Sequence, residues 1–238
     1  MSDIQSALIT GNSSGLGQGL TRVLLEQGAQ VYGMSRRGCP EAGVAADQRV
    51  DLADFDATAV AMDRLLEGVE SLDLVVLNAG LLGHMQRMQD APMDELRLLM
   101  DVNTFANKVI LDALLRGDVA VRQIVAISSG AAVSGAAGWS GYSLSKAALN
   151  MLIQLYAHEF PDTTAINALA PGLVDTPMQD YLCEEADRES FPVLQRLKAA
   201  RGTETMPDPE TAARAIIRVL PRLREIQRGS FVDIRQLD

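Results

Sequence analysis

The chain has 238 residues, of which 47 % are hydrophobic and 22 % charged, and its net charge is −10. This length suits one domain with a sizeable core, and the acidic balance argues against a protein that binds nucleic acid through a basic surface. No apolar run approaches the roughly 18 residues of a transmembrane helix, so we expect no contact with a membrane.

The N-terminus and the cysteines indicate a cytoplasmic protein. Residues 1–5 lack the basic segment of a signal peptide and lead almost directly into a strand-like run. Cys39 and Cys183 lie far apart in the sequence, which is typical of reduced thiols rather than of a disulfide framework.

Short apolar runs alternate with amphipathic segments along the whole chain. The apolar runs predict seven strands, at residues 7–10, 30–34, 49–51, 72–78, 123–128, 165–170 and 230–234. The segments between them predict helices at about 16–28, 54–69, 92–116, 139–160 and 209–220. This alternation predicts an α/β fold, with one doubly wound domain over residues 1–238, a seven-stranded parallel sheet and helices on both faces.

The stretch from about 175 to 209 is the least regular part of the chain. It is charged, contains several prolines and is long for a connection between two elements. Connections of this length often cover a binding site, so we expect a substrate lid here. A disordered segment is the alternative.

A glycine-rich turn follows the first strand and opens the next helix, with the spacing G-x-x-x-G-x-G. Glycines permit a tight turn and close backbone approach, while the free amides of a helix N-terminus favour a phosphate. The turn predicts a phosphate-binding loop, although a plain strand–helix connection is the alternative. Its candidate cofactor-binding residues are Gly11, Ser13, Ser14, Gly15, Leu16 and Gly17.

Ser35, Arg36 and Arg37 follow the second strand. A carboxylate at this point of a dinucleotide-binding fold accepts from the ribose 2′-hydroxyl, whereas an arginine accommodates a 2′-phosphate. Here the acidic position holds a serine, and two cations follow it in an otherwise acidic protein. The sequence therefore predicts a preference for NADP(H) over NAD(H), with solvated loop arginines as the alternative.

Further polar and small residues stand at the expected carboxyl ends of other strands, where ligands bind in such sheets. An aspartate after the third strand can accept from an adenine amino group, and an Ala-Gly turn lets a cofactor pass close to the backbone. A Pro-Gly segment after the sixth strand could line the nicotinamide side. These candidates are Asp51, Leu52, Asn78, Ala79, Gly80, Pro171, Gly172, Val174 and Thr176.

Tyr142 and Lys146 form the most informative pair in the chain. Four residues apart, they share one face of the helix expected at 139–160. An ammonium beside a phenol lowers the pKa of the phenol, towards the range useful for proton transfer near neutrality. Ser129, just after the fifth strand, can reach the same mouth of the sheet. The alternative is an exposed helix with an accidental pair.

Taken together, these motifs resemble the short-chain dehydrogenase/reductase family, in the family's order and spacing from the first strand to the last. The resemblance implies a Rossmann-type fold in which Tyr142 is the acid/base and Ser129 holds the substrate oxygen. It implies that Lys146 lowers the tyrosine pKa and binds the nicotinamide ribose, and that Asn103 anchors a proton-relay water. Tyr142 and Lys146 would then also contact the cofactor.

Several local stretches resemble the sepiapterin reductase/benzil reductase branch, among them residues 35–37, 138–142 and 171–179. That branch reduces vicinal dicarbonyl or related ketones with NADPH. Besides Ser129, the residues that we expect to face the substrate are Leu81, Leu82, His84, Ala131, Trp139, Leu173 and Met178, although methionine and tryptophan also commonly fill cores.

The expected function is an NADP(H)-dependent carbonyl reductase acting on a small molecule, with no metal. An NADP-dependent alcohol or hydroxy-acyl dehydrogenase working oxidatively is the alternative, and a non-catalytic dinucleotide-binding regulator is a third reading. The helix at 139–160 carries a broad apolar stripe, and enzymes of this family form dimers or tetramers through the corresponding helices. A homodimer or homotetramer is therefore expected, unless the stripe is all internal core.

Overall fold

A computed structural model describes residues 4–117, 119–186 and 191–237. In this part of the chain, seven parallel strands form one sheet in the order β3-β2-β1-β5-β7-β8-β9. The strands are β1 (Ser6–Thr10), β2 (Gln30–Ser35), β3 (Ala46–Arg49), β5 (Leu74–Leu77), β7 (Gln123–Ile127), β8 (Ala165–Ala170) and β9 (Phe231–Asp233). The predicted doubly wound α/β fold is confirmed.

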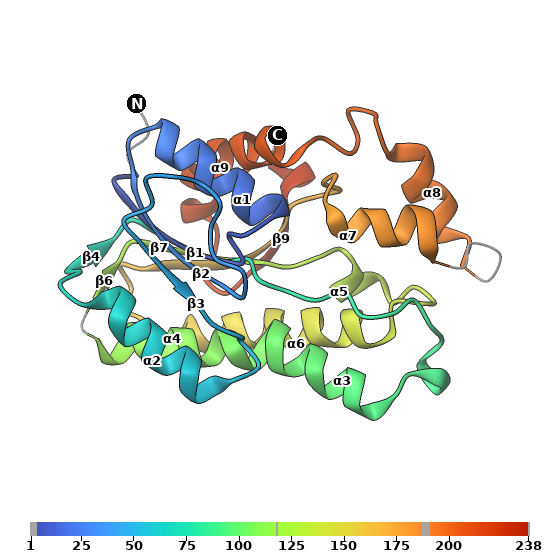
Figure 1. Ribbon diagram of the computed structural model, residues 1–238, viewed down its shortest axis with the longest axis horizontal. Coiled ribbons are helices and arrows are strands. Elements are labelled where there is room, and N and C mark those ends of the chain that lie inside the picture. Colours follow the sequence, from blue (N-terminus) through green and yellow to red (C-terminus); the bar gives the residue numbers. More distant parts are fainter. Residues whose placement is uncertain (1–3, 118, 187–190, 238) are drawn as a thin grey trace.

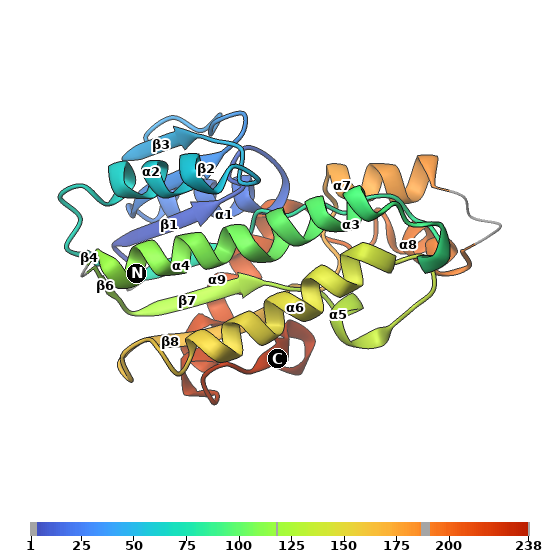
Figure 2. The same ribbon diagram turned by 90° about the horizontal axis from the view of Figure 1, so that it is seen from below.

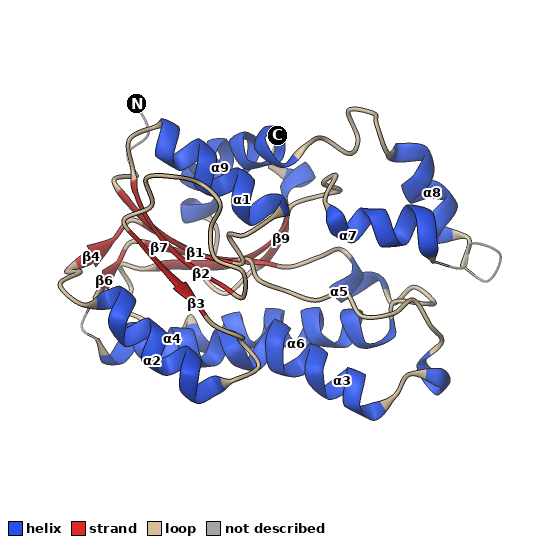
Figure 3. Cartoon of the chain, in the orientation of Figure 1, coloured by secondary structure: helices blue, strands red, loops and turns tan. Residues whose placement is uncertain are grey.

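Helices cover both faces of the sheet (Figures 1 and 3). One face carries α1 (Gly15–Glu26) and α9 (Pro209–Glu225), and the other carries α2 (Phe55–Leu66), α4 (Ala106–Arg116) and α6 (Ser140–Tyr156). The central strands β5 and β7 are buried along their whole length, because each face of the sheet packs against its own apolar cluster. The sheet is therefore a rigid support whose strand ends position the loops.

Two expected elements have different boundaries in the structure. The third strand was predicted at 49–51 but spans Ala46–Arg49, so Asp51 lies two residues beyond its end. The apolar pattern did not indicate this strand, because its sequence is polar. A polar sequence is possible here since β3 lies at the edge of the described sheet and pairs with β2 alone. The strand predicted at 72–78 is interrupted at Asp73, whose carboxylate accepts from the backbone amides of Gln5 and Ser6 at 2.6 and 3.1 Å.

Interruption at Asp73 leaves a short piece, β4 (Ser71–Leu72), which pairs with β6 (Ala120–Val121) outside the main sheet. The helix predicted at 92–116 is also divided. It runs as α3 (Met93–Met100), then a π-helical turn (Asp101–Phe105), then α4. In Figure 2, α3 and α4 follow one another along a line beside α6.

The stretch expected to be irregular contains α7 (Pro177–Asp180), a π-helical turn (Tyr181–Glu185) and α8 (Val193–Ala200). We call these elements the cap; residues 187–190 within it lie outside the described part. A separate apolar cluster holds the cap together and includes Leu182, Phe191 and Leu194. Met85 from the loop after β5 belongs to the same cluster, so the cap is packed against the carboxyl end of the sheet.

Candidate active site

Ser129, Tyr142 and Lys146 come together at the carboxyl end of β7. Ser129 lies two residues after the strand, and Tyr142 and Lys146 lie on the first two turns of α6. Lys146 is only 3 % exposed, and its Nζ donates to the carbonyl oxygen of Ile127 at 2.7 Å. The same Nζ lies 5.9 Å from the centre of the Tyr142 ring. Tyr142 and Lys146 therefore lie close together, as predicted, and Lys146 is bonded to the last residue of β7.

Burial dominates the proton affinity of both groups. It raises the pKa of Tyr142, and a hydrogen bond with Ser129 offsets part of that increase. Burial also lowers the pKa of Lys146 from its ordinary 10.5 to about 8. The prediction that the neighbouring ammonium brings the tyrosine pKa below its ordinary value is therefore wrong in direction. The cost of burying a phenolate sets this direction.

Ser129 is oriented as a hydrogen-bond donor. Its Oγ accepts from the backbone amide of Ala131, at the start of the short helix α5 (Ala131–Ser134), at 3.1 Å. A hydroxyl whose oxygen already accepts one bond can direct its own proton elsewhere. The proton is thus available for an oxygen beside Tyr142.

Asn103 braces the site from the π-helical turn. Its Oδ1 accepts from the Leu81 amide at 2.7 Å, and its Nδ2 donates to the Leu81 carbonyl at 2.8 Å and to Ser145 Oγ at 2.9 Å. The Ser145 hydroxyl in turn donates to the carbonyl oxygen of Tyr142 at 2.9 Å. These bonds tie the loop after β5 to the first turn of α6. The relay-water role expected for Asn103 stays a prediction.

Ser145 was missed from the sequence. Its position three residues after Tyr142 gives it the right helix face, but serine is common on helices and its partner Asn103 is 42 residues away. Spacing alone could have suggested it, whereas its bonds require the fold.

The glycine-rich turn is joined to the end of β5 by Thr10. The Thr10 hydroxyl oxygen accepts from the backbone amides of Asn78 and Ala79, both at 3.0 Å, and Asn78 Nδ2 donates to the Thr10 carbonyl at 2.9 Å. Gly11 has a φ of +70°, and a β-carbon there would lie 2.8 Å from Ala79 Cα. The two strand ends therefore approach as closely as the missing side chain allows.

Gly80 lies at the junction of the two halves of the site. A β-carbon there would be 3.2 Å from Asn103 Oδ1 and 3.3 Å from Lys146 Nζ. Gly80 thus brings the predicted cofactor-binding loop close to Lys146 and Asn103, and a larger residue would crowd both side chains.

The segment after β8 closes the other side of the glycine-rich turn. Gly172 has a φ of +78°, and the Thr176 side chain lies 3.2 Å from the point where a β-carbon on Gly15 would stand. Val174 is buried and Pro171 is half-buried. Asp51, by contrast, is exposed, and its carboxylate accepts from the Ala53 amide at 3.1 Å, while Leu52 is buried.

Ser35, Arg36 and Arg37 lie where a phosphate could be recognised. Within the described residues, the buried hydroxyl of Ser35 has no hydrogen-bond partner. Both arginines are exposed, and Arg37 Nη2 donates to Ser14 Oγ at 2.7 Å, which joins this segment to the glycine-rich turn. An unpaired buried hydroxyl beside two cations fits an anionic group of a dinucleotide.

Some of the candidate substrate residues pack against the cap beside Tyr142, and His84 is exposed at the surface. The Trp139 ring lies 5.9 Å from the Tyr142 ring, and Trp139, Leu82 and Leu173 pack against the apolar cluster of the cap. His84 is at the rim, with a 74 % exposed side chain and its Nδ1 at 3.2 Å from Glu95 Oε2. Leu81, Ala131 and Met178 are half-buried, in the loop after β5, in α5 and in α7 respectively.

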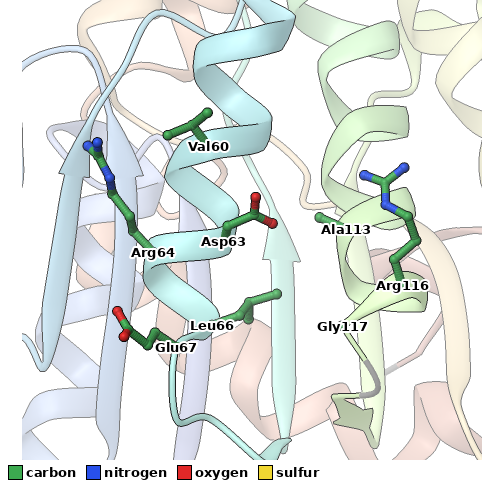
Figure 4. A pocket seen from close by; sticks show the side chains of 8 residues that line it. All are labelled: Val60, Asp63, Arg64, Leu66, Glu67, Ala113, Arg116 and Gly117. Atoms are coloured by element: carbon green, nitrogen blue, oxygen red, sulfur yellow. The ribbon is translucent and has the colours of Figure 1, made fainter.

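A surface hollow between α2 and α4 is unrelated to this site. Figure 4 shows side chains of both helices around it. Its lining includes Val60, Asp63, Arg64, Leu66, Glu67, Ala113, Arg116 and Gly117, none of which follows a strand at the carboxyl edge. We therefore place the candidate site by the converging side chains at the strand ends.

The described residues contain no cluster of three or more histidine, cysteine, aspartate or glutamate side chains that could hold a metal ion. None of the helices in the described ranges is long and apolar enough to cross a membrane.

Residues 5–187 match the family model described as short chain dehydrogenase. The chain is 30 % identical to a benzil reductase ((S)-benzoin forming) of Saccharomyces cerevisiae over 236 residues, covering 90 % of this chain and 89 % of that protein. It is 28 % identical to the Bacillus subtilis benzil reductase ((S)-benzoin forming), covering 96 % and 98 %. A short chain dehydrogenase from Burkholderia cenocepacia, solved in complex with NADP, has a TM-score of 0.75 at 26 % identity, covering 95 % and 94 %.

The buried Lys146 should make stability depend on pH. Between its folded pKa of about 8 and its ordinary 10.5, the unfolded chain holds a proton that the folded protein has released, so the free energy of unfolding rises with pH. Below pH 8 the lysine is protonated in both states and its contribution is constant. Urea unfolding at pH 7 to 10 should show this rise, and Lys146→Met should remove it, a difference of about 3 kcal/mol over the full window.

The control for this measurement is Lys198→Met, because Lys198 is exposed on α8. It should keep the pH dependence of the wild type. The same slope in the Lys146→Met protein as in the wild type would contradict the assignment. The window stops at pH 10 because the raised pKa of Tyr142 acts in the opposite direction above it.

Proposed function

The chain belongs to the short chain dehydrogenase family, and on that premise we propose that it is an NADP(H)-dependent carbonyl reductase acting on a ketone or vicinal dicarbonyl. The observation that supports this most is the convergence of Ser129, Tyr142 and Lys146 at the carboxyl end of β7. A protein that only bound a dinucleotide would not need a half-buried phenol and a buried ammonium beside an oriented hydroxyl.

In the proposed mechanism, NADPH supplies a hydride from its nicotinamide ring when bound. Tyr142 donates its phenolic proton to the substrate carbonyl oxygen as that oxygen gains negative charge. Ser129 donates a hydrogen bond to the same oxygen and so stabilises the charge where it develops. Lys146, held by the Ile127 carbonyl, places a cation near the phenolate that forms.

Reduction and the oxidative alternative need opposite protonation states of Tyr142. Burial raises the pKa of Tyr142, so the phenol holds its proton at neutral pH and is ready to donate it. An enzyme that mainly oxidises alcohols needs the deprotonated form as a base. The reverse reaction would therefore gain from a more alkaline medium.

An apolar, aromatic carbonyl compound suits the surroundings of Tyr142. Trp139 lies against the Tyr142 ring and, like Leu173, packs on the cap, whose cluster includes Phe191 and Leu194. The two relatives named benzil reductase match over most of their length, and their name gives an aromatic vicinal diketone as substrate. Benzil is thus the first compound to test.

The wild-type protein should oxidise NADPH in the presence of benzil, measured by the loss of absorbance of the reduced nicotinamide. Tyr142→Phe keeps the ring and its contact with Trp139 but removes the proton donor, so turnover should be lost. Binding of NADPH, followed by its fluorescence, should persist in this variant. Retention of most of the activity would overturn the role of Tyr142, and NADPH binding without turnover of diketones, quinones or aromatic ketones would overturn the substrate class.

The preference for NADP(H) rests on the cations after β2. Arg36 and Arg37 are exposed beside the unpaired Ser35 hydroxyl, and no carboxylate occupies the position that would accept from a ribose 2′-hydroxyl. An arginine guanidinium matches a phosphate with two parallel donors, which a 2′-hydroxyl cannot use.

Replacing Arg36 with aspartate should weaken this preference. Arg36→Asp should lower the ratio of kcat/KM for NADPH to that for NADH by at least about tenfold, or about 1.4 kcal/mol. Arg64→Asp on α2 is a matched control, because this arginine lies in the hollow of Figure 4. An unchanged ratio in the Arg36→Asp protein would mean that Arg36 is only solvated.

We also propose that two copies associate through α6. Part of the predicted apolar stripe is internal, since Leu152 packs on the core, but Met151 and Leu155 are 55 % and 54 % exposed. Leu144, about two turns before Met151 and three before Leu155 on the same face, is also exposed. A continuous exposed apolar face of this kind is typical of an interface.

Light scattering should give a mass at least twice that of one chain. Leu155→Glu, which adds a charge to this face, should shift the mass towards one chain without unfolding the protein. Val60→Glu, an equally exposed apolar position on α2, should not. A single-chain mass for the wild type at micromolar concentration would contradict the association.

A further inference from the structure

Asp47 joins two segments that flank the predicted phosphate site. It lies on the edge strand β3, next to Gly33 of β2 in the strand register. Its Oδ1 accepts from Asn12 Nδ2 of the glycine-rich turn at 2.8 Å, and its Oδ2 accepts from the Cys39 backbone amide at 2.9 Å. The second bond anchors the loop that begins with Arg36 and Arg37.

Two glycines make room for this carboxylate. A β-carbon on Gly33 would overlap Asn12 Nδ2 and lie 2.5 Å from Asp47 Oδ1. Gly38 has a φ of +81°, and a β-carbon there would lie 3.2 Å from Asp47 Oδ2 and 2.6 Å from Arg49 Nε. The half-buried Asp47 carboxylate therefore packs closely against the backbone on both sides of the two arginines.

Asn12 is completely buried, and in the described part of the chain its Oδ1 has no partner. Its Nδ2 hydrogen bond to Asp47 links the glycine-rich turn to β3. Arg37, in the loop after β2, donates to Ser14 and so joins that loop to the glycine-rich turn directly. Asp47, through Cys39 and Asn12, and Arg37, through Ser14, thus both hold the loop after β2 against the glycine-rich turn.

We propose that Asp47 is a positioning residue for recognition of the 2′-phosphate of NADP(H), acting by holding the Arg36–Arg37 segment against the glycine-rich turn. This inference rests on the proposed coenzyme preference. The physical reason is entropic: a loop already held in its binding conformation loses less freedom when the phosphate binds.

Charge and position have opposite consequences at this residue. A carboxylate near a phosphate repels it, so if Asp47 acted through its charge alone, removing it would tighten binding. If Asp47 acts by position, removing it weakens binding. The sign of the change therefore separates the two roles.

The test is calorimetric titration with 2′,5′-ADP, which carries the 2′-phosphate, and with ADP, which lacks it. Asp47→Ala should weaken 2′,5′-ADP about tenfold relative to ADP, because it removes two hydrogen bonds to a charged acceptor. Asp47→Asn should recover most of the affinity, since its oxygen still accepts from the Cys39 amide and its Nδ2 can donate to Asn12 Oδ1 once the Asn12 amide turns over. Thermal unfolding of each variant confirms that it is folded.

Tighter 2′,5′-ADP binding in both variants would overturn the inference in favour of a charge effect, and an equal loss for both nucleotides would reduce Asp47 to a general structural role. Arg36→Ala separates the inference from its premise. If Arg36→Ala weakens 2′,5′-ADP but Asp47→Ala does not, only the inference fails. If the wild type does not favour 2′,5′-ADP over ADP, the coenzyme preference itself fails.

Discussion

The hydrogen bond from Lys146 to the carbonyl oxygen of Ile127 is the constraint on which the site depends. It fixes the start of α6 against the end of β7 and thereby sets Tyr142 relative to Ser129. The ammonium is buried to do so, at a cost that appears in the lowered pKa of Lys146. Such a cost is tolerated at functional sites, where a group must be ready in one place before the ligand arrives.

The rest of the carboxyl edge follows the same scheme, in which short polar side chains join segments that are distant in sequence. Thr10 joins β1 to the end of β5, Asn103 joins the next loop to α6, and Asp47 joins β3 to two loops at once. Parallel strands supply no hydrogen bonds beyond their ends, so the loops must be held by side chains. The sheet therefore gives the site its location, and these side chains give it its shape.

The sequence predicted the sheet, its order of elements and the meeting of Tyr142, Lys146 and Ser129, because apolar runs and a four-residue helix spacing are local signals. It did not predict β3 correctly, because an edge strand can be polar. It gave the wrong direction for the pKa of Tyr142, because burial is a property of the whole fold. Asp47 carried no signal, since its partners Asn12 and Cys39 meet only once β2 and β3 are in register. The cap helices were not predicted, because prolines and charged residues interrupt their apolar pattern. Their apolar residues pack together with Met85, a contact that exists only in the folded chain.

The π-helical turn at Asp101–Phe105 has a consequence for the two helices that it separates. A π turn inserts one residue into the helical path, and one residue corresponds to about 100° around the axis. The faces of α3 and α4 are therefore out of phase, although both lie along one line in Figure 2. This phase slip lets α3 pack against α6 while α4 packs against α2. One continuous helical segment thus packs against α6 with its first part and against α2 with its second, and Asn103 lies in the turn between the two parts.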